Sequence, residues 1–205
     1  DELLLSEMLQ SNNYKTGIFG KWHLGDAEKF MPTNHGFDEF YGILFSNDMW
    51  PFHPERPQDY PNDLMLYKND KPVQALIDQS DLTKNITDES IRFIEENKNN
   101  QFFLYIAHPQ PHVPLFAKNN FLGTQERGIY GDVINEIDFS FGRIYDVLKK
   151  NNLVNNTVII FTSDNGPWLS CGTHSGPPGI FREGKGTCWE GGNRVPAIIS
   201  YPKKI

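Results

Sequence analysis

The sequence has few cysteines and no long apolar segment. Its two cysteines, Cys171 and Cys188, are too few for a dense disulfide framework or a four-cysteine zinc site. No apolar run approaches the roughly 20 residues that a helix needs to span a bilayer. These absences exclude a disulfide scaffold and a membrane-spanning chain.

Basic blocks are also missing. The formal net charge is −7 and no arginine-rich arm offsets it, which weighs against nucleic acid as a partner. Instead, 38% hydrophobic and 22% charged residues over 205 positions are typical of one globular domain with a sizeable core. The chain begins at Asp1, without an initiator Met or a signal-peptide pattern, and ends at Ile205 after a strand-like run. We therefore expect this sequence to be a piece of a longer protein.

Hydrophobic periodicity predicts helices that alternate with apolar strands. The segments with helical spacing are residues 1–12, 82–97 and 129–148. The segments expected to be strands are residues 16–19, 102–107, 158–161 and 195–199. Two of them, 102–107 and 158–161, are apolar throughout, which favours strands buried on both faces. Residues 31–73, rich in Pro, Asn and aromatics, predict an irregular excursion with a hairpin around residues 68–71. This order indicates an α/β fold with a mostly parallel sheet flanked by helices.

Each of the first three predicted strands leads directly into polar residues that are capable of chemistry. These clusters occupy residues 20–25, 108–112 and 162–166. In open parallel sheets, ligands bind beyond the carboxyl ends of the strands. We therefore expect the three clusters to converge on one crevice.

The first cluster offers two cationic side chains. An extended backbone would place Lys21 and His23 on one face and Trp22 on the other. Glycines at both ends of the cluster allow close backbone approach. The pair indicates a site for an anion, although a solvated Lys beside a structural His explains this segment alone equally well.

The second cluster contains two histidines with the i, i+4 spacing of a helical zinc site. Pro109 and Pro111 exclude the helix that such a site requires, so a zinc-protease-like centre is rejected. His108 fits a packed or exposed histidine at the end of a strand. His112 lies further into the loop and is a candidate proton donor or anion ligand.

The third cluster supplies two adjacent oxygen ligands, Asp164 and Asn165, before Gly166. A carboxylate beside an amide carbonyl suits a hard cation such as Ca²⁺ or Mg²⁺ better than zinc. An ordinary Asx turn is the alternative, because Asn-Gly is common in turns.

A glycine-rich stretch at residues 172–192 holds Lys185 between Gly184 and Gly186. The spacing of a Walker phosphate loop is absent. A flexible linker is the simplest alternative, but Trp189 and the strand that follows favour an ordered loop. Together these segments predict an anionic substrate held by Lys and His around a divalent cation, as in hydrolysis of a sulfate or phosphate ester.

At these segments the sequence resembles the sulfatase family, in particular the branch of arylsulfatase A and N-acetylgalactosamine-6-sulfatase. The most specific stretches are Gly-Lys-Trp-His-Leu-Gly at residues 20–25 and Gly-Lys-Gly-Thr with Glu-Gly-Gly at residues 184–192. The matching segments run in family order over nearly the whole chain: 16–25, 34–38, 111–112, 121–124, 130–132, 162–167, 184–187 and 189–192.

The resemblance implies an alkaline-phosphatase-like α/β sandwich that hydrolyses sulfate esters through a formylglycine. That residue is made from a cysteine or serine by a formylglycine-generating enzyme, and its hydrate attacks sulfur. By resemblance, Lys21 and His23 hold and polarise the formylglycine and the sulfate, Lys185 binds the same sulfate, and His112 stabilises or protonates the leaving oxygen. Asp164 and Asn165 would be two of the ligands of Ca²⁺, with Mg²⁺ less favoured, and Asp164 would help to deprotonate the nucleophile.

The sequence departs from the family at its nucleophile. The Cys-x-Pro-Ser-Arg motif is absent, and neither Cys171 nor Cys188 has the neighbours to replace it. The paired aspartates that complete the family's calcium site are missing too. We therefore expect residues 1–205 to be a partial catalytic domain, without the nucleophile segment and the C-terminal subdomain, and to be inactive alone.

Two other functions stay open. One is hydrolysis of phosphate or phosphonate monoesters by a member of the same superfamily, and the other is non-catalytic binding of sulfated glycans. The expected partners are a small-molecule or glycan sulfate ester and the formylglycine-generating enzyme, with no nucleic acid. The family implies a lysosomal or extracellular location in a eukaryote and a periplasmic or secreted one in a bacterium.

Overall fold

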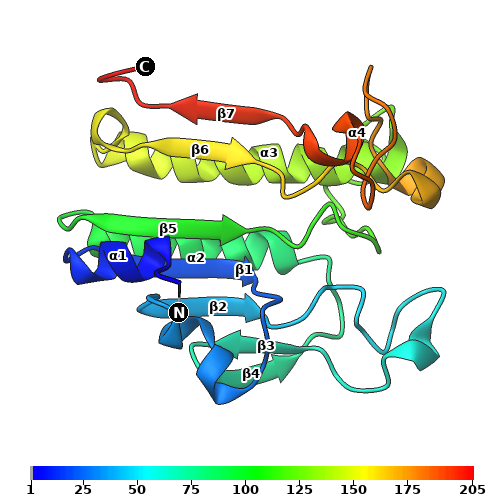
Figure 1. Ribbon diagram of the computed structural model, residues 1–205, viewed down its shortest axis with the longest axis horizontal. Helices are drawn as coiled ribbons and strands as arrows, with labels where there is room; N and C mark the ends of the chain where they lie inside the picture. Colours follow the sequence, from blue (N-terminus) through cyan, green and yellow to red (C-terminus); the bar gives the residue numbers. More distant parts are fainter. Residues whose placement is uncertain (1) are drawn as a thin grey trace.

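The computed structural model describes residues 2–205 and contains two β-sheets (Figure 1). The larger sheet has the strand order β4-β3-β2-β1-β5. Its strands are β1 (Lys15–Lys21), β2 (Glu39–Ile43), β3 (Met65–Lys68), β4 (Lys71–Ala75) and β5 (Phe102–Ala107). β1 pairs in parallel with β2 and β5. β3 pairs antiparallel with both β2 and β4. The smaller sheet is an antiparallel pair of β6 (Ile159–Thr162) and β7 (Ala197–Ser200).

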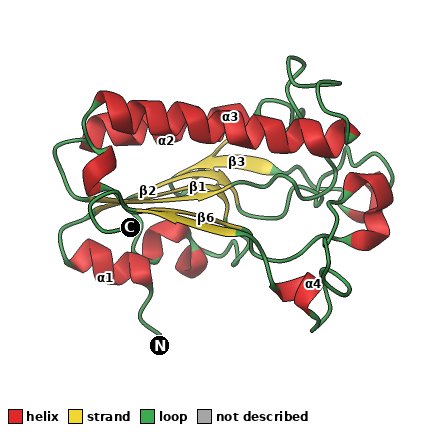
Figure 2. Cartoon of the chain, turned by 90° about the horizontal axis from the view of Figure 1, so that it is seen from above, coloured by secondary structure: helices red, strands yellow, loops and turns green. Residues whose placement is uncertain are grey.

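Two long helices, α2 (Leu82–Asn97) and α3 (Gly128–Lys150), lie on one face of the sheets (Figure 2). The short helix α1 (Leu5–Ser11) lies on the opposite face, and α4 (Glu190–Asn193) lies beyond the strands. The helices predicted at residues 82–97 and 129–148 are thus confirmed, and the N-terminal one is shorter than the spacing indicates. No helix among residues 2–205 has the length and apolar character required to cross a membrane.

The apolar face of α2 closes the main core. Ile86 and Phe93 are buried against Phe19 of β1, and the rings of Phe19 and Phe93 meet edge to face with centroids 5.7 Å apart. A second cluster, Ile94 with Ile144, joins α2 to α3 and packs against β5 and β6. One helical layer therefore supports both sheets and fixes where their carboxyl ends lie.

Gly20 allows β1 and β5 to approach closely just before they reach the predicted site. Its φ of +129° suits glycine, and a Cβ built there would lie 1.9 Å from the carbonyl oxygen of Ala107. A larger residue would therefore displace one of the two strands. The glycine brings the loop after β5 next to Lys21 at the end of β1.

Three elements differ from the sequence-based expectation. β2 falls within residues 31–73, which the sequence predicts to be irregular. The strand was not predicted because Glu39 and Gly42 break the apolar run that would have indicated it. β5 and β6 are strands, but the prediction that both are buried on both faces is wrong. No residue of β5 is fully buried, and Tyr105 is 52% exposed. Ile160 of β6 is 64% exposed and Ile198 of β7 is 63% exposed, so the described residues leave these apolar side chains uncovered.

Candidate active site

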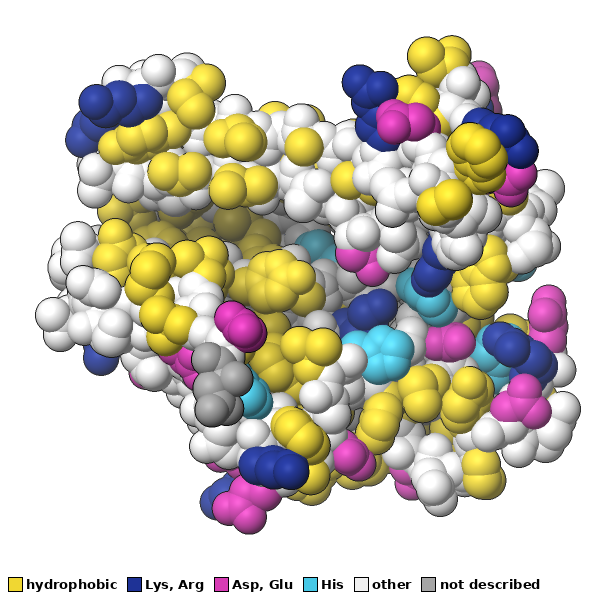
Figure 3. Space-filling view, viewed as in Figure 1, with side chains coloured by type: hydrophobic (Ala, Val, Ile, Leu, Met, Phe, Trp, Pro, Cys, Tyr) yellow, Lys and Arg dark blue, Asp and Glu magenta, His cyan; other side chains and the backbone are white. Residues whose placement is uncertain are grey.

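The predicted clusters meet in a hollow at the carboxyl ends of the parallel strands. In Figure 3, Lys and Arg (dark blue), His (cyan) and acidic (magenta) side chains gather there, to the right of the sheets. Lys21 is the last residue of β1, His112 follows β5, and Asp164 follows β6. Lys185 acts electrostatically on Lys21, His23 and His112, so the four predicted cations occupy one neighbourhood.

Lys21 and Lys185 are both half-buried, and Lys21 is the lysine on which the surrounding charges act most clearly. Its side chain is partly buried, and that burial lowers the pKa of its ammonium group, an effect to which Lys185 adds. Asp164 and the unpredicted Asp48 act in the opposite direction and raise the pKa. Two carboxylates thus favour the charged form of Lys21, the form that binds an anion.

His23 departs from the extended backbone that the sequence favours. Its φ is +56°, in the left-handed region, and its backbone N–H donates to the carbonyl of Leu44 at 2.9 Å. The neighbouring Trp22 is buried, and its indole N–H donates to the carbonyl of Phe30 at 2.8 Å. This anchor leaves His23 at the exposed edge of the hollow, where partial burial and Lys21 lower its pKa.

His112 is held in one tautomer. Its Nδ1 lies 2.7 Å from the carbonyl oxygen of Val113, and because a carbonyl only accepts, Nδ1 carries the proton. Burial lowers the pKa of His112, and Lys185 and Lys21 lower it further. Nε2 is therefore left to contact a substrate.

Asp48 was missed by sequence reasoning. Its Oδ1 lies 3.9 Å from Nδ1 of His112, and it raises the pKa of that histidine as well as that of Lys21. This oxygen is buried, and among residues 2–205 it has no hydrogen-bond partner. The signal that could have found Asp48 is its place in the loop after β2, a strand that the sequence analysis did not identify.

The segment around Asp48 also fixes the loop that carries His112. The buried amide of Asn47 donates to the carbonyls of His112 and Pro114, both at 3.2 Å. Gln79 returns a hydrogen bond to the carbonyl of Asn47 at 2.8 Å. These contacts tie the loop after β5 to the loop after β2.

His108 lies outside the hollow, as expected for a packed histidine. Burial lowers its pKa to about 4, and its Nε2 lies 3.4 Å from the hydroxyl of Ser140 on α3. Its buried Nδ1 has no partner within the described part of the chain. His108 is therefore a half-buried histidine whose surroundings favour the neutral form.

The glycine-rich segment is an ordered loop, as Trp189 led us to expect. The backbone N–H of Lys185 donates to the carbonyl of Pro167 at 2.8 Å, and that of Gly166 donates to the carbonyl of Gly192 at 2.9 Å. The Nζ of Lys185 lies 5.0 Å from the ring centroid of Trp168. The loop is thereby fixed to the turn that follows β6.

Asp164 and Asn165 occupy that turn. Asp164 is exposed, and the hydroxyl of Ser163 donates to the backbone carbonyl of Asn165 at 3.0 Å. No group of three or more His, Cys, Asp or Glu suited to a metal occurs among residues 2–205. A carboxylate and an amide fit a hard cation in kind, but Ca²⁺ takes about six to eight oxygen ligands, so these two residues supply only part of such a site.

The two cysteines do not offer a nucleophile. Cys188 is exposed, and both thiols are free. Burial raises the pKa of the Cys171 thiol, which disfavours the reactive thiolate.

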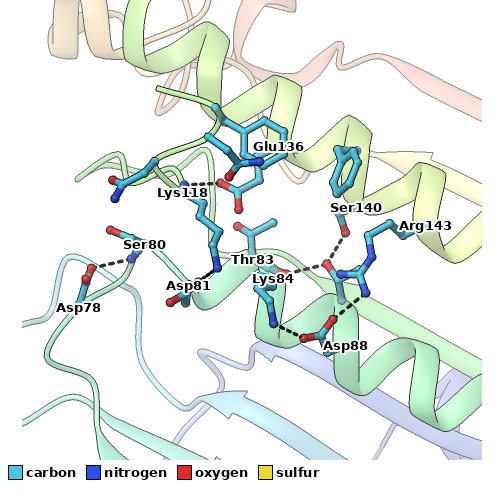
Figure 4. A pocket seen from close by; sticks show the side chains of 15 residues that line it. Asp78, Ser80, Asp81, Thr83, Lys84, Asp88, Lys118, Glu136, Ser140 and Arg143 are labelled. Atoms are coloured by element: carbon cyan, nitrogen blue, oxygen red, sulfur yellow. Dashed lines mark hydrogen bonds and ion pairs between the residues drawn. The ribbon is translucent and has the colours of Figure 1, made fainter. Parts of the chain in front are cut away.

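A separate cavity of about 820 Å³ lies between α2 and α3 (Figure 4). Most of its charged side chains pair with one another: Lys84 and Arg143 both contact Asp88, and Lys118 contacts Asp81. None of the predicted site residues lines it. We therefore place the candidate active site in the hollow at the strand ends.

The Sulfatase family model matches residues 1–205. The chain is 38% identical to an arylsulfatase of Hemicentrotus pulcherrimus and 37% identical to the N-acetylgalactosamine-6-sulfatase of Homo sapiens, in each case over all of this chain. These alignments cover 39% and 40% of the two relatives, so the chain spans about two fifths of their length.

Solved structures support the same family assignment. The PsFucS1 sulfatase from Pseudoalteromonas sp. superposes with a TM-score of 0.87 at 30% identity, over 98% of this chain and 45% of that one. Ps i-CgsB in complex with k-i-k-neocarrahexaose gives a TM-score of 0.78 at 33% identity, over 97% and 47%. The fold is therefore the alkaline-phosphatase-like α/β fold of these enzymes, with a mixed, mostly parallel central sheet. The chain belongs to the sulfatase family.

Proposed function

We propose that the protein hydrolyses sulfate esters, as an arylsulfatase-like enzyme. The observation that supports this most is the convergence of Lys21, His112 and Lys185 from three separate segments of a chain whose net charge is −7. A local group of cations in an acidic protein suits a small anion. Family membership makes sulfate the preferred anion.

The two lysines bind the sulfate. The ammonium groups of Lys21 and Lys185 donate hydrogen bonds to the sulfuryl oxygens and offset the negative charge that grows on them as the ester bond breaks. His23, at the edge of the hollow, adds a third donor. Asp48 and Asp164 favour the charged form of Lys21 before the substrate arrives.

His112 handles the leaving oxygen. The Nδ1–H of His112 donates to the carbonyl of Val113, so Nε2 is the nitrogen available to the substrate. In the charged form of His112, Nε2–H donates a proton to the departing alkoxide or phenoxide. Asp48 supports the imidazolium form from 3.9 Å away. Thus His112 acts as the general acid, and Asp48 as its positioning residue.

Two groups would complete the site. A formylglycine from a segment outside these residues would supply the oxygen nucleophile. A divalent cation, Ca²⁺ rather than Mg²⁺, would be held in part by Asp164 and Asn165 and would add positive charge beside the sulfate. Residues 1–205 then form a partial catalytic domain, and an aryl sulfate assay of the isolated chain should show no turnover. A calcium-dependent burst followed by turnover would contradict this division of the site.

The substrate is a sulfate ester of a small molecule or a glycan. The relatives named as arylsulfatase and N-acetylgalactosamine-6-sulfatase, and a neighbour solved with a neocarrahexaose, support this class. The formylglycine-generating enzyme is the protein partner. The location is lysosomal or extracellular in a eukaryote, or periplasmic or secreted in a bacterium.

Competing substrates test the proposal. The natural full-length protein is supplied with matched aryl sulfate and aryl phosphate esters in calcium buffer, and sulfate and phosphate release are measured together. We expect sulfate release to dominate. Preferential phosphate release would identify a phosphate monoester hydrolase, and binding of a sulfated glycan without release of either ion would identify a non-catalytic binder.

A further inference from the structure

The four tryptophans of the chain divide into two classes. Trp22 and Trp50 are buried, and the indole N–H of each donates to a backbone carbonyl, of Phe30 and Leu76 respectively. Trp168 and Trp189 are exposed, with 37% and 44% of their surface open to solvent. The first pair holds the core together, so the second pair requires another explanation.

The ring of Trp168 lies close to two residues of the candidate site, His112 and Lys185. Its ring centroid lies 5.7 Å from that of His112, with the planes tilted by 54°. The Nζ of Lys185 lies 5.0 Å from the same indole ring. An ester whose sulfate contacts Lys185 and whose leaving oxygen contacts His112 would therefore have its alcohol part next to Trp168.

The backbone fixes this position. The neighbouring carbonyl of Pro167 accepts the N–H of Lys185, and the carbonyl of Trp168 accepts the N–H of Cys171 at 3.0 Å, where the turn Leu169–His174 begins. An indole anchored on both sides is a rigid apolar surface, which binds a ligand at low entropic cost.

From this geometry we infer that Trp168 is the platform for the ring of the esterified alcohol, and that the preferred substrates are sulfate esters of cyclic alcohols such as pyranoses. The inference rests on the proposed function. A pyranose presents a face of C–H groups that packs on an indole, while its hydroxyl groups point to the rim and to solvent. An acyclic alcohol has no such face and gains much less from the platform.

A purely structural role for Trp168 makes a different prediction. If the indole only held His112 and Lys185 in place, its removal would slow every sulfate ester equally, because the sulfate-binding groups themselves would move. A ring platform affects cyclic esters selectively. The matched control is Trp189, an exposed tryptophan of the same loop whose ring lies 3.7 Å from the guanidinium carbon of Arg182.

The experiment compares kcat/KM of the natural full-length protein on a pyranose sulfate and on an acyclic polyol sulfate. We expect Trp168→Ala to lower kcat/KM for the pyranose ester about tenfold, mostly through KM, and for the acyclic ester less than about twofold. Trp168→Phe should recover most of the loss, and Trp189→Ala should leave both values near wild type. Thermal melting confirms that each variant is folded.

The outcomes separate the inference from the proposed function. Equal losses on both esters, or no loss on the pyranose ester, would overturn the role of Trp168 and leave sulfate hydrolysis standing. If the wild-type protein released sulfate from an aryl sulfate but from neither of these esters, the role of Trp168 would be overturned and the proposed function would stand. Release from none of the three esters would overturn both.

Discussion

At the scale of single residues, the hollow is a balance between cations and two carboxylates. Burial and the neighbouring lysines lower the pKa of His112, whereas Asp48 raises it. A general acid must be protonated to act, so activity that depends on His112 falls as pH rises through its pKa. We therefore expect Asp48 to extend the active range of the proposed reaction toward higher pH.

Replacing Asp48 by Asn should shift the pH at which activity falls on the alkaline side. The substitution removes the charge that favours imidazolium, and the alkaline limb of the pH profile of kcat/KM should move down by about one pH unit. The control is Asp59→Asn, at an exposed carboxylate of the same loop region. An unchanged limb in Asp48→Asn would show that Asp48 does not act on the catalytic proton.

His108 should make the fold sensitive to acid. Its pKa in the native state is about 4, below the 6.5 of an ordinary histidine. Between these two values the unfolded chain binds a proton at His108 and the native chain does not. The stabilisation is full above the ordinary pKa and is lost as pH falls toward the native one. The loss amounts to about 2–3 kcal/mol between about pH 7 and about pH 4.5.

His108→Asn should abolish most of this loss, as measured by urea unfolding of the full-length protein at the two pH values. His174, an exposed histidine, provides the control, and His174→Asn should lose stability with acid as the wild type does. Equal acid sensitivity in His108→Asn and wild type would refute the neutral state of His108.

At the scale of elements, strands β1 and β5 position the site because their carboxyl ends lie side by side at the same edge of the sheet. Periodicity was enough to predict α2, α3 and β5, because their apolar residues recur without interruption. It failed for β2, which Gly42 interrupts. It failed also for the burial of β5 and β6, since an apolar run does not reveal what covers it. It failed also for His23, whose positive φ follows from the anchoring of Trp22.

Gly20→Ala should damage this arrangement. The new Cβ would lie 1.9 Å from the carbonyl oxygen of Ala107, so β1 and β5 must separate at the edge of the hollow. We expect a loss of about 3 kcal/mol or more in the free energy of unfolding, measured by urea titration.

The matched control is Gly142→Ala in α3, where a Cβ meets no atom within 4 Å. Because alanine favours a helix over glycine, this change should stabilise the protein by about 0.5–1 kcal/mol. Similar effects of the two substitutions would show that Gly20 is not needed for the close approach of the strands.

At the scale of the whole molecule, an acidic chain carries a local group of cations. The positions of Lys21, His112, Asp164 and Asn165 could be predicted, because strands that run in parallel deliver their next residues to one edge. Asp48 could not, since its strand was not identified. Nor could the place of Trp168, which depends on how the turn after β6 folds back on Lys185.

The measurement that tests the central claim most directly is the initial rate of sulfate release from an aryl sulfate by the natural full-length protein and its lysine variants. Lys21→Ala and Lys185→Ala should each reduce kcat by about 100-fold or more, because each removes a donor from the sulfuryl oxygens. Lys149→Ala, at an exposed lysine of α3, should leave the rate unchanged. Wild-type rates in both site variants would contradict the claim that these lysines form the sulfate site.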